Sequence, residues 1–174
     1  MTLSRSFHDI YKHTEWILLD DLTLRSYEAT DWPRARLIHD QARPIELQGS
    51  CDPRAFVPLA EDKDDLQEFS DCQKLVACLG DRVVGFIGIN GNEIGWLYVD
   101  PAESRKGIGR QLLRKGLTTI NSPATVHVLE GNTPALDLYL SEGFAKVDSF
   151  KSKNNGYPCT VLYLHRAEAL SDIG

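Results

Sequence analysis

The sequence has few of the features that mark metal, redox or membrane proteins. Its four cysteines include no C-x-x-C pair and its five histidines lie far apart, so neither a zinc cluster nor a redox motif is predicted. We expect reduced cysteines that serve in packing, and no metal cofactor. The apolar patch at residues 16–19 is too short for a signal or membrane-spanning segment, so we expect a cytoplasmic protein without a membrane partner.

An excess of basic residues is also missing. The formal net charge is -6 at pH 7 and the sequence pI is about 5.3. General binding to nucleic acids or to anionic membranes requires a basic face, so neither partner is expected. The acidic balance instead suits a cationic acceptor.

Nothing in the composition marks a second domain. The 174 residues are 42% hydrophobic, which is enough for one well-cored domain, and the chain has no repeats or low-complexity tracts. We predict one domain over residues 22–166, with an N-terminal extension at 1–21 and a C-terminal tail at 167–174. The short apolar patch of the extension is expected to form either an extra turn on the sheet or a dimer contact, and the sequence leaves both open.

Residues 92–117 carry the strongest local signal, a strand followed by a loop and a helix. The strand-type residues end at Asp100-Pro101, because proline cannot donate a ladder hydrogen bond. Gly107-Ile108-Gly109 then leads into a helix at 110–115, whose paired leucines suit one buried face. Glycines without Cβ atoms let a ligand approach the unpaired N–H groups of the helix's first turn. The pattern predicts an anion site, with phosphate as the favoured anion.

Three basic side chains flank this loop, Arg105, Lys106 and Arg110, so the local charge is opposite to that of the whole chain. An ordinary strand-to-helix turn, with glycines for tight packing and solvated basic residues, is the alternative explanation. The loop lacks the third glycine of the dinucleotide fingerprint and the G-K-[ST] ending of a P-loop, which disfavours both of those families.

A second motif follows an apolar strand at 124–129. Residues 132–144 read N-T-P-A-L-D-L-Y-L-S-E-G-F, and this stretch after the glycine loop resembles the GCN5-related N-acetyltransferases. Their loop has the pattern [QR]-x-x-G-x-[GA], from which this chain departs with Ser104 at the first position and Arg105 where glycine is frequent. Their second motif is N-x-x-A-x-x-L-Y-x-x-x-G-F, which is matched by Asn132, Ala135, Leu138, Tyr139, Gly143 and Phe144.

The resemblance implies a single α/β domain, in which a central mixed, mostly antiparallel sheet has a splayed parallel strand pair and helices on both faces. The hydrophobic pattern agrees, because turns at Gly80-Asp81 and Gly91-Asn92 join three strands and a helical crossover makes strands 93–99 and 124–129 parallel. Residues 42–60, which include Pro44, are predicted to form a loop or a broken helix, and in the resembling family this region lines the acceptor pocket. The predicted strands are 22–27, 73–79, 82–90, 93–99, 124–129, 145–151 and 160–165, and the predicted helices are 32–41, 61–70, 110–115 and one after Asn132.

The resemblance further implies acetyl-CoA as co-substrate. In the family, backbone amides of the glycine loop cradle the pyrophosphate, and backbone groups of the central strand pair with the pantetheine arm. Asn132 is expected to cap the following helix and to touch the arm. The implied cofactor-binding residues are Leu97, Tyr98, Val99, Arg105, Lys106, Gly107, Ile108, Gly109, Arg110, Asn132 and Tyr139.

Proton transfer groups are implied at three positions. Tyr139 stands where the family places the general acid that protonates the departing thiolate. An acceptor amine of the lysine type has a pKa near ~10.4 and must lose a proton before it attacks, so a base is required. Glu93, at the start of the central strand, and His127, within an apolar strand, are alternative bases, and each is also explained as an ordinary strand residue.

The predicted function is direct transfer of an acetyl group from acetyl-CoA to an amine, either a small molecule or a protein amino group. The alternative is a non-catalytic acyl-CoA-binding or regulatory domain of the same fold. The acceptor's identity and the choice of base stay open, and so does a homodimer.

Overall fold

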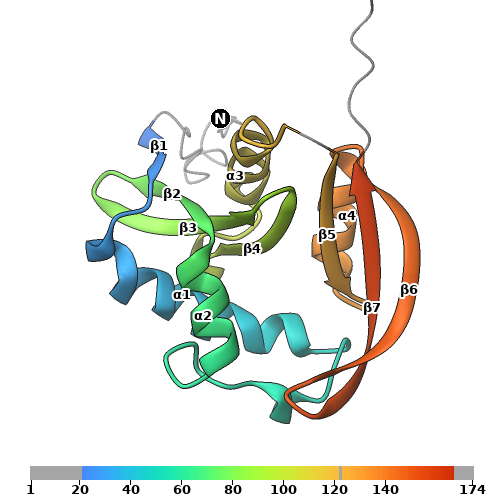
Figure 1. Ribbon diagram of the computed structural model, residues 1–174. Coiled ribbons are helices and arrows are strands. Elements are labelled where there is room, and N and C mark those ends of the chain that lie inside the picture. Colours follow the sequence, from blue (N-terminus) through green and yellow to red (C-terminus); the bar gives the residue numbers. More distant parts are fainter. Residues whose placement is uncertain (1–20, 122, 167–174) are drawn as a thin grey trace, which may run out of the picture.

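Seven strands form one mixed sheet in residues 21–121 and 123–166, the parts of the chain that the computed structural model describes (Figure 1). The strand order is β1-β2-β3-β4-β5-β7-β6, and every neighbouring pair is antiparallel except β4 and β5, which are parallel. The predicted fold class is therefore confirmed. The strands are β1 Leu22–Ser26, β2 Gln73–Leu79, β3 Arg82–Asn90, β4 Glu93–Val99, β5 Ala124–Leu129, β6 Ala145–Asn154 and β7 Tyr157–Arg166.

Helices cover both faces of this sheet. Buried residues of α3 and α4 pack with β3, β4 and β5 in one apolar cluster, whereas α1 and α2 pack with Phe86 and Trp96 in a second cluster. The four α-helices are α1 Trp32–Leu47, α2 Lys63–Asp71, α3 Ile108–Leu117 and α4 Thr133–Ser141. None of the helices that the structure describes is long and apolar enough to cross a membrane.

Tight turns join the antiparallel strands. Gly80-Asp81 and Gly91-Asn92 connect β2, β3 and β4 as predicted, and both glycines have positive φ angles. The last hairpin differs from the prediction, which placed a loop around residues 154–158. Asn155 and Gly156 both adopt left-handed φ angles and form a two-residue turn, so β6 and β7 extend to it. Pro158 is tolerated because the β5 pairing of β7 begins only at Val161.

Helix α1 is longer than the sequence predicts. The predicted helix ended near residue 41 because Pro44 removes a backbone donor, yet α1 continues through Pro44 to Leu47. Leu47 is fully buried, and the Glu46 carboxylate accepts a hydrogen bond from the Tyr98 hydroxyl at 2.7 Å. These tertiary contacts stabilise a last turn that local propensity disfavours.

The parallel pair opens after two residues. Glu93 pairs with Thr125 and Ile94 pairs with Val126, and no further pairing joins β4 to β5 (Figure 1). On the other side of β4 the register shifts, because Ile89 pairs with Ile94 and Gly88 pairs with Trp96, which leaves Gly95 as an extra residue. Such a bulge bends its strand and increases the local twist. The predicted splay therefore begins at Gly95.

The N-terminal extension apart from Asp21, and the C-terminal tail, lie outside the described residues. Cys51, Cys72, Cys78 and Cys159 are all free, as the sequence predicted. Among the described residues no group of three His, Cys, Asp or Glu side chains is arranged to hold a metal ion.

Gly88 pairs with Trp96 beside the bulge, and a substitution at Gly88 tests how tightly the core is packed there. A Cβ atom there would lie 2.7 Å from the Cys72 Sγ and 2.8 Å from Cδ1 of Trp96, both of which are buried. We predict that Gly88→Ala lowers the free energy of unfolding by about 1–3 kcal/mol, as overpacking of a core does. Urea unfolding measures this, with the exposed Gln73→Ala as control. Wild-type stability of Gly88→Ala would contradict the packing.

Candidate active site

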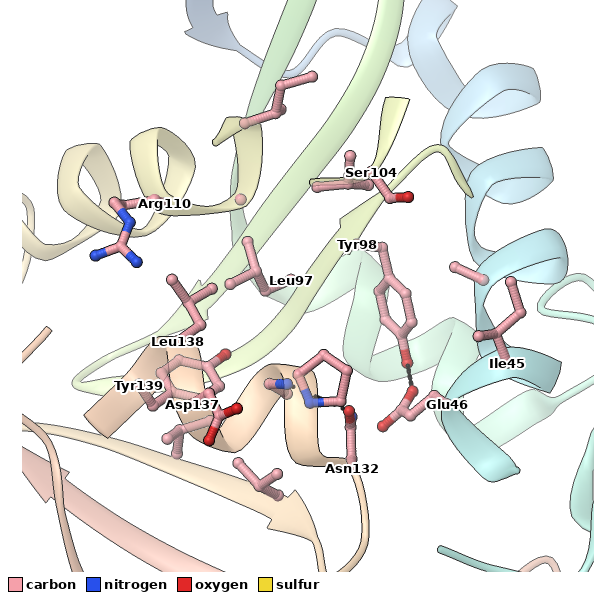
Figure 2. A pocket seen from close by; sticks show the side chains of 18 of the residues that line it. Ile45, Glu46, Leu97, Tyr98, Ser104, Arg110, Asn132, Asp137, Leu138 and Tyr139 are labelled. Carbon is pink, nitrogen blue, oxygen red and sulfur yellow. Dashed lines mark hydrogen bonds between the residues drawn. The ribbon is translucent and has the colours of Figure 1, made fainter. Parts of the chain in front are cut away.

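The opening between β4 and β5 forms part of a cleft of about 780 Å³. Its walls come from the end of α1, from β4 and β5, from the loop before α3, and from α4. Leu97, Tyr98 and Val99 of β4 all line it, and Figure 2 shows Tyr98 and Leu97 between the α1 and α4 sides. Because β4 has no β5 partner beyond Ile94, its backbone groups on that side are available to a ligand.

One end of the cleft is built from the first turn of α3. Gly107, with a φ of 83°, is the N-cap, and the helix begins at Ile108, two residues before the predicted start. The first backbone bond of the helix runs from the Gln111 N–H to the Gly107 carbonyl. The amides of Ile108, Gly109 and Arg110 precede it and belong to residues that line the cleft. This arrangement suits an anion.

Gly109 faces the space between β4 and α4. A Cβ atom on Gly109 would lie 3.6 Å from a methyl carbon of Val99 and 3.7 Å from a methyl carbon of Leu138, which are ordinary van der Waals distances. A longer side chain at this position would therefore project between β4 and α4, at the end of the cleft where the amides of α3 lie.

Two of the three basic side chains of the loop are held by carboxylates. The Lys106 ammonium contacts Glu103 at 2.7 Å, and Arg110 contacts Glu142 at 2.5 Å. Arg105 is exposed, has a positive φ of 66°, and makes no ion pair with the described residues. Of the three residues predicted to place fixed or mobile positive charge around the loop, Lys106 and Arg110 are therefore fixed, each by a carboxylate that a second arginine, Arg82 or Arg114, also binds.

Tyr139 lies on α4, whose start is fixed by two local features. The Asn132 side chain accepts a hydrogen bond from the Ala135 N–H at 3.3 Å, which confirms the predicted cap, and Pro134 lies in the first turn. Tyr139 is 5% exposed and packs edge-on against Phe144. Its hydroxyl has no hydrogen-bond partner among the described residues, and burial, followed by the charge of Glu46, raises its pKa.

Glu93 and His127, predicted as alternative bases, are in contact. The His127 Nδ1 lies 2.7 Å from Oε1 of Glu93. The His127 side chain is 42% exposed and the Glu93 side chain is 46% exposed. The imidazole packs against Tyr163 with ring centroids 4.9 Å apart. His127 lines the cleft. The two residues therefore form a pair at the edge of the cleft.

A partly buried polar cluster on the α1 side lies within the region expected to line the acceptor pocket, but the sequence did not single out its members. Oε2 of Glu46 accepts a hydrogen bond from the Tyr98 hydroxyl at 2.7 Å (Figure 2). The same oxygen also contacts the Arg43 guanidinium at 2.7 Å. No sequence motif marks Glu46, and the predicted helix ended before it. Only the continuation of α1 through Pro44 brings this carboxylate to the cleft.

A further carboxylate stands beside the bulge. A Cβ atom on Gly95 would lie 2.7 Å from Oε1 of Glu68, which belongs to α2. Burial, then the charges of Asp65 and Glu93, raises the pKa of Glu68. The α2 side of the opening is therefore electrically negative.

Comparison with known proteins shows which family the sequence matches. A family model described as "Acetyltransferase (GNAT) family" matches residues 27–144. A peptidyl-lysine N-acetyltransferase, YjaB of Salmonella typhimurium, is 32% identical over 84 residues, which span 48% of this chain and 57% of that relative's length.

Solved structures share the fold. A GCN5-related N-acetyltransferase from Rhodopseudomonas palustris aligns with a TM-score of 0.73 at 19% identity, covering 83% of this chain and 94% of that one. The PaiA N-acetyltransferase of Thermoplasma acidophilum, solved in complex with coenzyme A, aligns with a TM-score of 0.67 at 18% identity, covering 84% and 98%.

The ion pairs around α3 and α4 predict an acid-sensitive stability. Hydrogen bonds from Arg114, followed by those from Arg110, outweigh burial and lower the pKa of Glu142 below its usual 4.5. A lowered pKa in the folded state means that the stabilisation is present above about pH 4.5 and is lost as the pH falls through the folded value. We predict that Glu142→Gln is less stable than wild type at pH 7 and loses less stability on acidification.

Urea unfolding at pH 7 and at about pH 3 measures this difference, since protonation of Glu142 is complete only well below its unfolded pKa. Glu61→Gln is the control, because Glu61 is exposed and forms no ion pair with the described residues. The same acid-induced loss in Glu142→Gln and in wild type would show that these ion pairs do not stabilise the fold.

Proposed function

The chain belongs to the acetyltransferase (GNAT) family, and we propose that it transfers the acetyl group of acetyl-CoA directly to an amine, without a covalent enzyme intermediate. One observation carries the proposal. A single cleft combines an amide-lined anion end, an opened parallel strand pair, a tyrosine with a free hydroxyl, and a carboxylate–imidazole pair at its edge.

The residues present fit acetyl-CoA. The amides of Ile108, Gly109 and Arg110 suit a pyrophosphate, since an N-terminal helix turn offers both unpaired donors and the positive dipole end. The strand gap beyond Ile94 offers backbone donors and acceptors to an amide-containing arm. The coenzyme A complex of PaiA, a protein of the same fold, supports this choice.

When bound, acetyl-CoA supplies an activated acetyl thioester. Leu97 and Val99 follow the bulge on a strand that has no partner on the β5 side, so their backbone groups are free to bind the arm and the thioester oxygen. A fixed N–H aimed at that oxygen stabilises the negative charge that develops as the amine adds. The nucleophile is the amine nitrogen itself, and no side chain forms an ester or thioester.

The Glu93–His127 pair is assigned to proton removal. An aliphatic ammonium has a pKa of about 10.4, so the nitrogen must give up a proton before or as its bond to the carbonyl carbon forms. The imidazole of His127 lines the cleft and accepts this proton, while Glu93, at 2.7 Å from Nδ1, fixes the ring and stabilises the imidazolium. The exposed position of the pair lets the proton pass on to water.

Tyr139 is assigned to the leaving group. As the carbon–sulfur bond breaks, its electron pair stays on sulfur, and the Tyr139 hydroxyl donates its proton there. The second proton of the nitrogen, released as the amide forms, restores the phenol, so that one proton in total passes to water. The raised pKa keeps the phenol protonated at neutral pH but makes a complete transfer to an ordinary thiolate uphill. Donation is therefore expected during bond cleavage, when the charge on sulfur develops.

The acceptor is proposed to be an amine of a small molecule or of a protein. The peptidyl-lysine activity named for YjaB supports a lysine-type amine, although that match covers only part of either chain. The negative charges of Glu68, Asp65 and Glu93 on the α2 side of the opening also favour a cationic acceptor.

Tyr139→Phe tests the assigned acid. We predict that kcat falls by about 10²–10⁴-fold, because the departing sulfur loses its proton donor, while acetyl-CoA binding survives. Release of free thiol from acetyl-CoA measures turnover. Tyr27→Phe is the matched control, since Tyr27 packs on Phe69 of α2 and does not line the cleft. Unchanged turnover would remove Tyr139 as the acid.

Gly109→Asp tests the anion end. Ligand at about 100 times its dissociation constant adds roughly 2.7 kcal/mol of stability, so acetyl-CoA should raise the wild-type melting temperature and NADH and ATP should not. We predict that the added carboxylate abolishes this shift without unfolding the protein. Gln111→Glu, which adds the same charge to α3 outside the cleft lining, should keep it.

Tight acetyl-CoA binding by Gly109→Asp would show that the anion end is misassigned. If wild type binds acetyl-CoA but acetylates no amine, the non-catalytic acyl-CoA-binding alternative is favoured over the enzyme.

A further inference from the structure

The Glu46 carboxylate has unused hydrogen-bonding capacity inside the cleft. We propose that it binds the ammonium group of the acceptor, and that the acceptor is an unhindered aliphatic amine, either free or on a lysine side chain. This inference rests on the proposed function and adds the residue that selects the acceptor. Glu46 lines the cleft and its side chain is 19% exposed.

Glu46 is held by one of its two oxygens. Oε2 receives both the Tyr98 hydroxyl and the Arg43 guanidinium, each at 2.7 Å. Oε1 has no hydrogen-bond partner among the described residues. An ionised carboxylate offers about four lone-pair sites, so Oε1 is free to accept N–H donors. The two fixed contacts orient the carboxylate and leave its other oxygen for a ligand.

The position of Glu46 is fixed by backbone packing at the end of α1. A Cβ atom on Gly131 would lie 2.4 Å from the Gly49 carbonyl oxygen, so the chain after α1 lies directly against the turn that precedes α4. Leu47 is fully buried next to Glu46. The end of α1, which carries Glu46, is therefore in contact with the turn that leads into α4, which carries Tyr139. Figure 2 shows Glu46 and Tyr139 on either side of the same cleft.

Glu46 also lies near the proposed reaction centre. Its negative charge is the second cause, after burial, of the raised pKa of the Tyr139 hydroxyl. An ammonium bound at Glu46 would thus lie within the electrostatic reach of the proton donor, on the side of the cleft opposite to it (Figure 2).

The surrounding cluster is one positive charge short. The Arg43 guanidinium, 15% exposed, faces the carboxylates of both Glu46 and Asp65. His39 also faces Asp65, but it contacts the Asp40 carboxylate at 3.0 Å, so this neighbour adds a carboxylate as well as an imidazole to the cluster. One cation against two carboxylates favours the entry of a second cation.

The other carboxylates that line the cleft are less suited to this role. Glu103 is already bound by Arg82 and Lys106. Asp137 is exposed, where water weakens its attraction for a cation. Glu46 alone among these three lining carboxylates combines burial, fixed orientation and a free oxygen.

Glu46→Gln tests the inference, because the amide keeps the size of the side chain and removes the charge. The probes are benzylamine, a free amine, and N-acetyl-lysine methylamide, a peptide-like one, both cationic at neutral pH, with aniline as a small uncharged amine. We expect kcat/KM for the two cations to fall by about 10- to 100-fold, mainly through KM, because a charge-assisted hydrogen bond is lost. The preference over aniline should shrink accordingly.

Two binding measurements accompany the kinetics. Calorimetry of benzylamine with the CoA-bound protein should show the same weakening, while the thermal shift caused by acetyl-CoA should not change. Glu130→Gln is the control, since Glu130 is exposed at the end of β5 and does not line the cleft. The better of the two cationic probes in wild type identifies the source, a free amine or a lysine side chain.

The outcomes separate this inference from the proposed function. Wild-type turnover of the cations with an unchanged KM in Glu46→Gln overturns the role of Glu46 and leaves the enzyme intact. Acetyl-CoA binding without acetylation of any amine overturns both. If the unpaired Arg43 prevents Glu46→Gln from folding, the double variant Arg43→Met/Glu46→Gln, which removes both charges, is measured in the same way.

Discussion

The site depends on one constraint, the extra residue that Gly95 contributes to β4. Because the register of β3 and β4 shifts at this point, β4 bends and its pairing with β5 stops after Ile94. Gly88, opposite the bulge, has no room for a Cβ atom, since Cys72 and Trp96 lie in the space that it would fill. Backbone groups that a regular sheet would use internally are thereby left for a ligand, at the centre of the domain.

Electrostatics in the cleft follow from local pairing rather than from net charge. At the α3 end Glu103 is shared by Lys106 and Arg82, and Glu142 is shared by Arg110 and Arg114, so cations outnumber carboxylates there and add to the attraction of the backbone amides for an anion. On the α1 and α2 side, carboxylates outnumber cations. An acidic chain can therefore combine a positive end and a carboxylate-rich side in one cleft.

Much of the fold was predictable because its signals are local. The turns at Gly80-Asp81 and Gly91-Asn92 and the cap at Asn132 each depend on two to four neighbouring residues. The errors occurred where a distant contact outweighed a local preference. Pro44 disfavours a helix, but burial of Leu47 and the bond between Glu46 and Tyr98 retain it. Likewise β6 and β7 extend beyond their predicted ends to a two-residue turn, because the two strands pair with each other along their length.

The sequence alone determined the order of strands and helices, the glycine loop at the start of α3, and the position of Tyr139 behind a capped turn, since each is encoded within one contiguous stretch. The tertiary structure decided which charges are free and which residues share the cleft. It joined Glu93 to His127 and Arg110 to Glu142, and it brought Glu46 to the cleft opposite Tyr139. Hydrogen bonds and ion pairs act over a few ångströms, and only folding brings residues that are 32 or more positions apart to that distance.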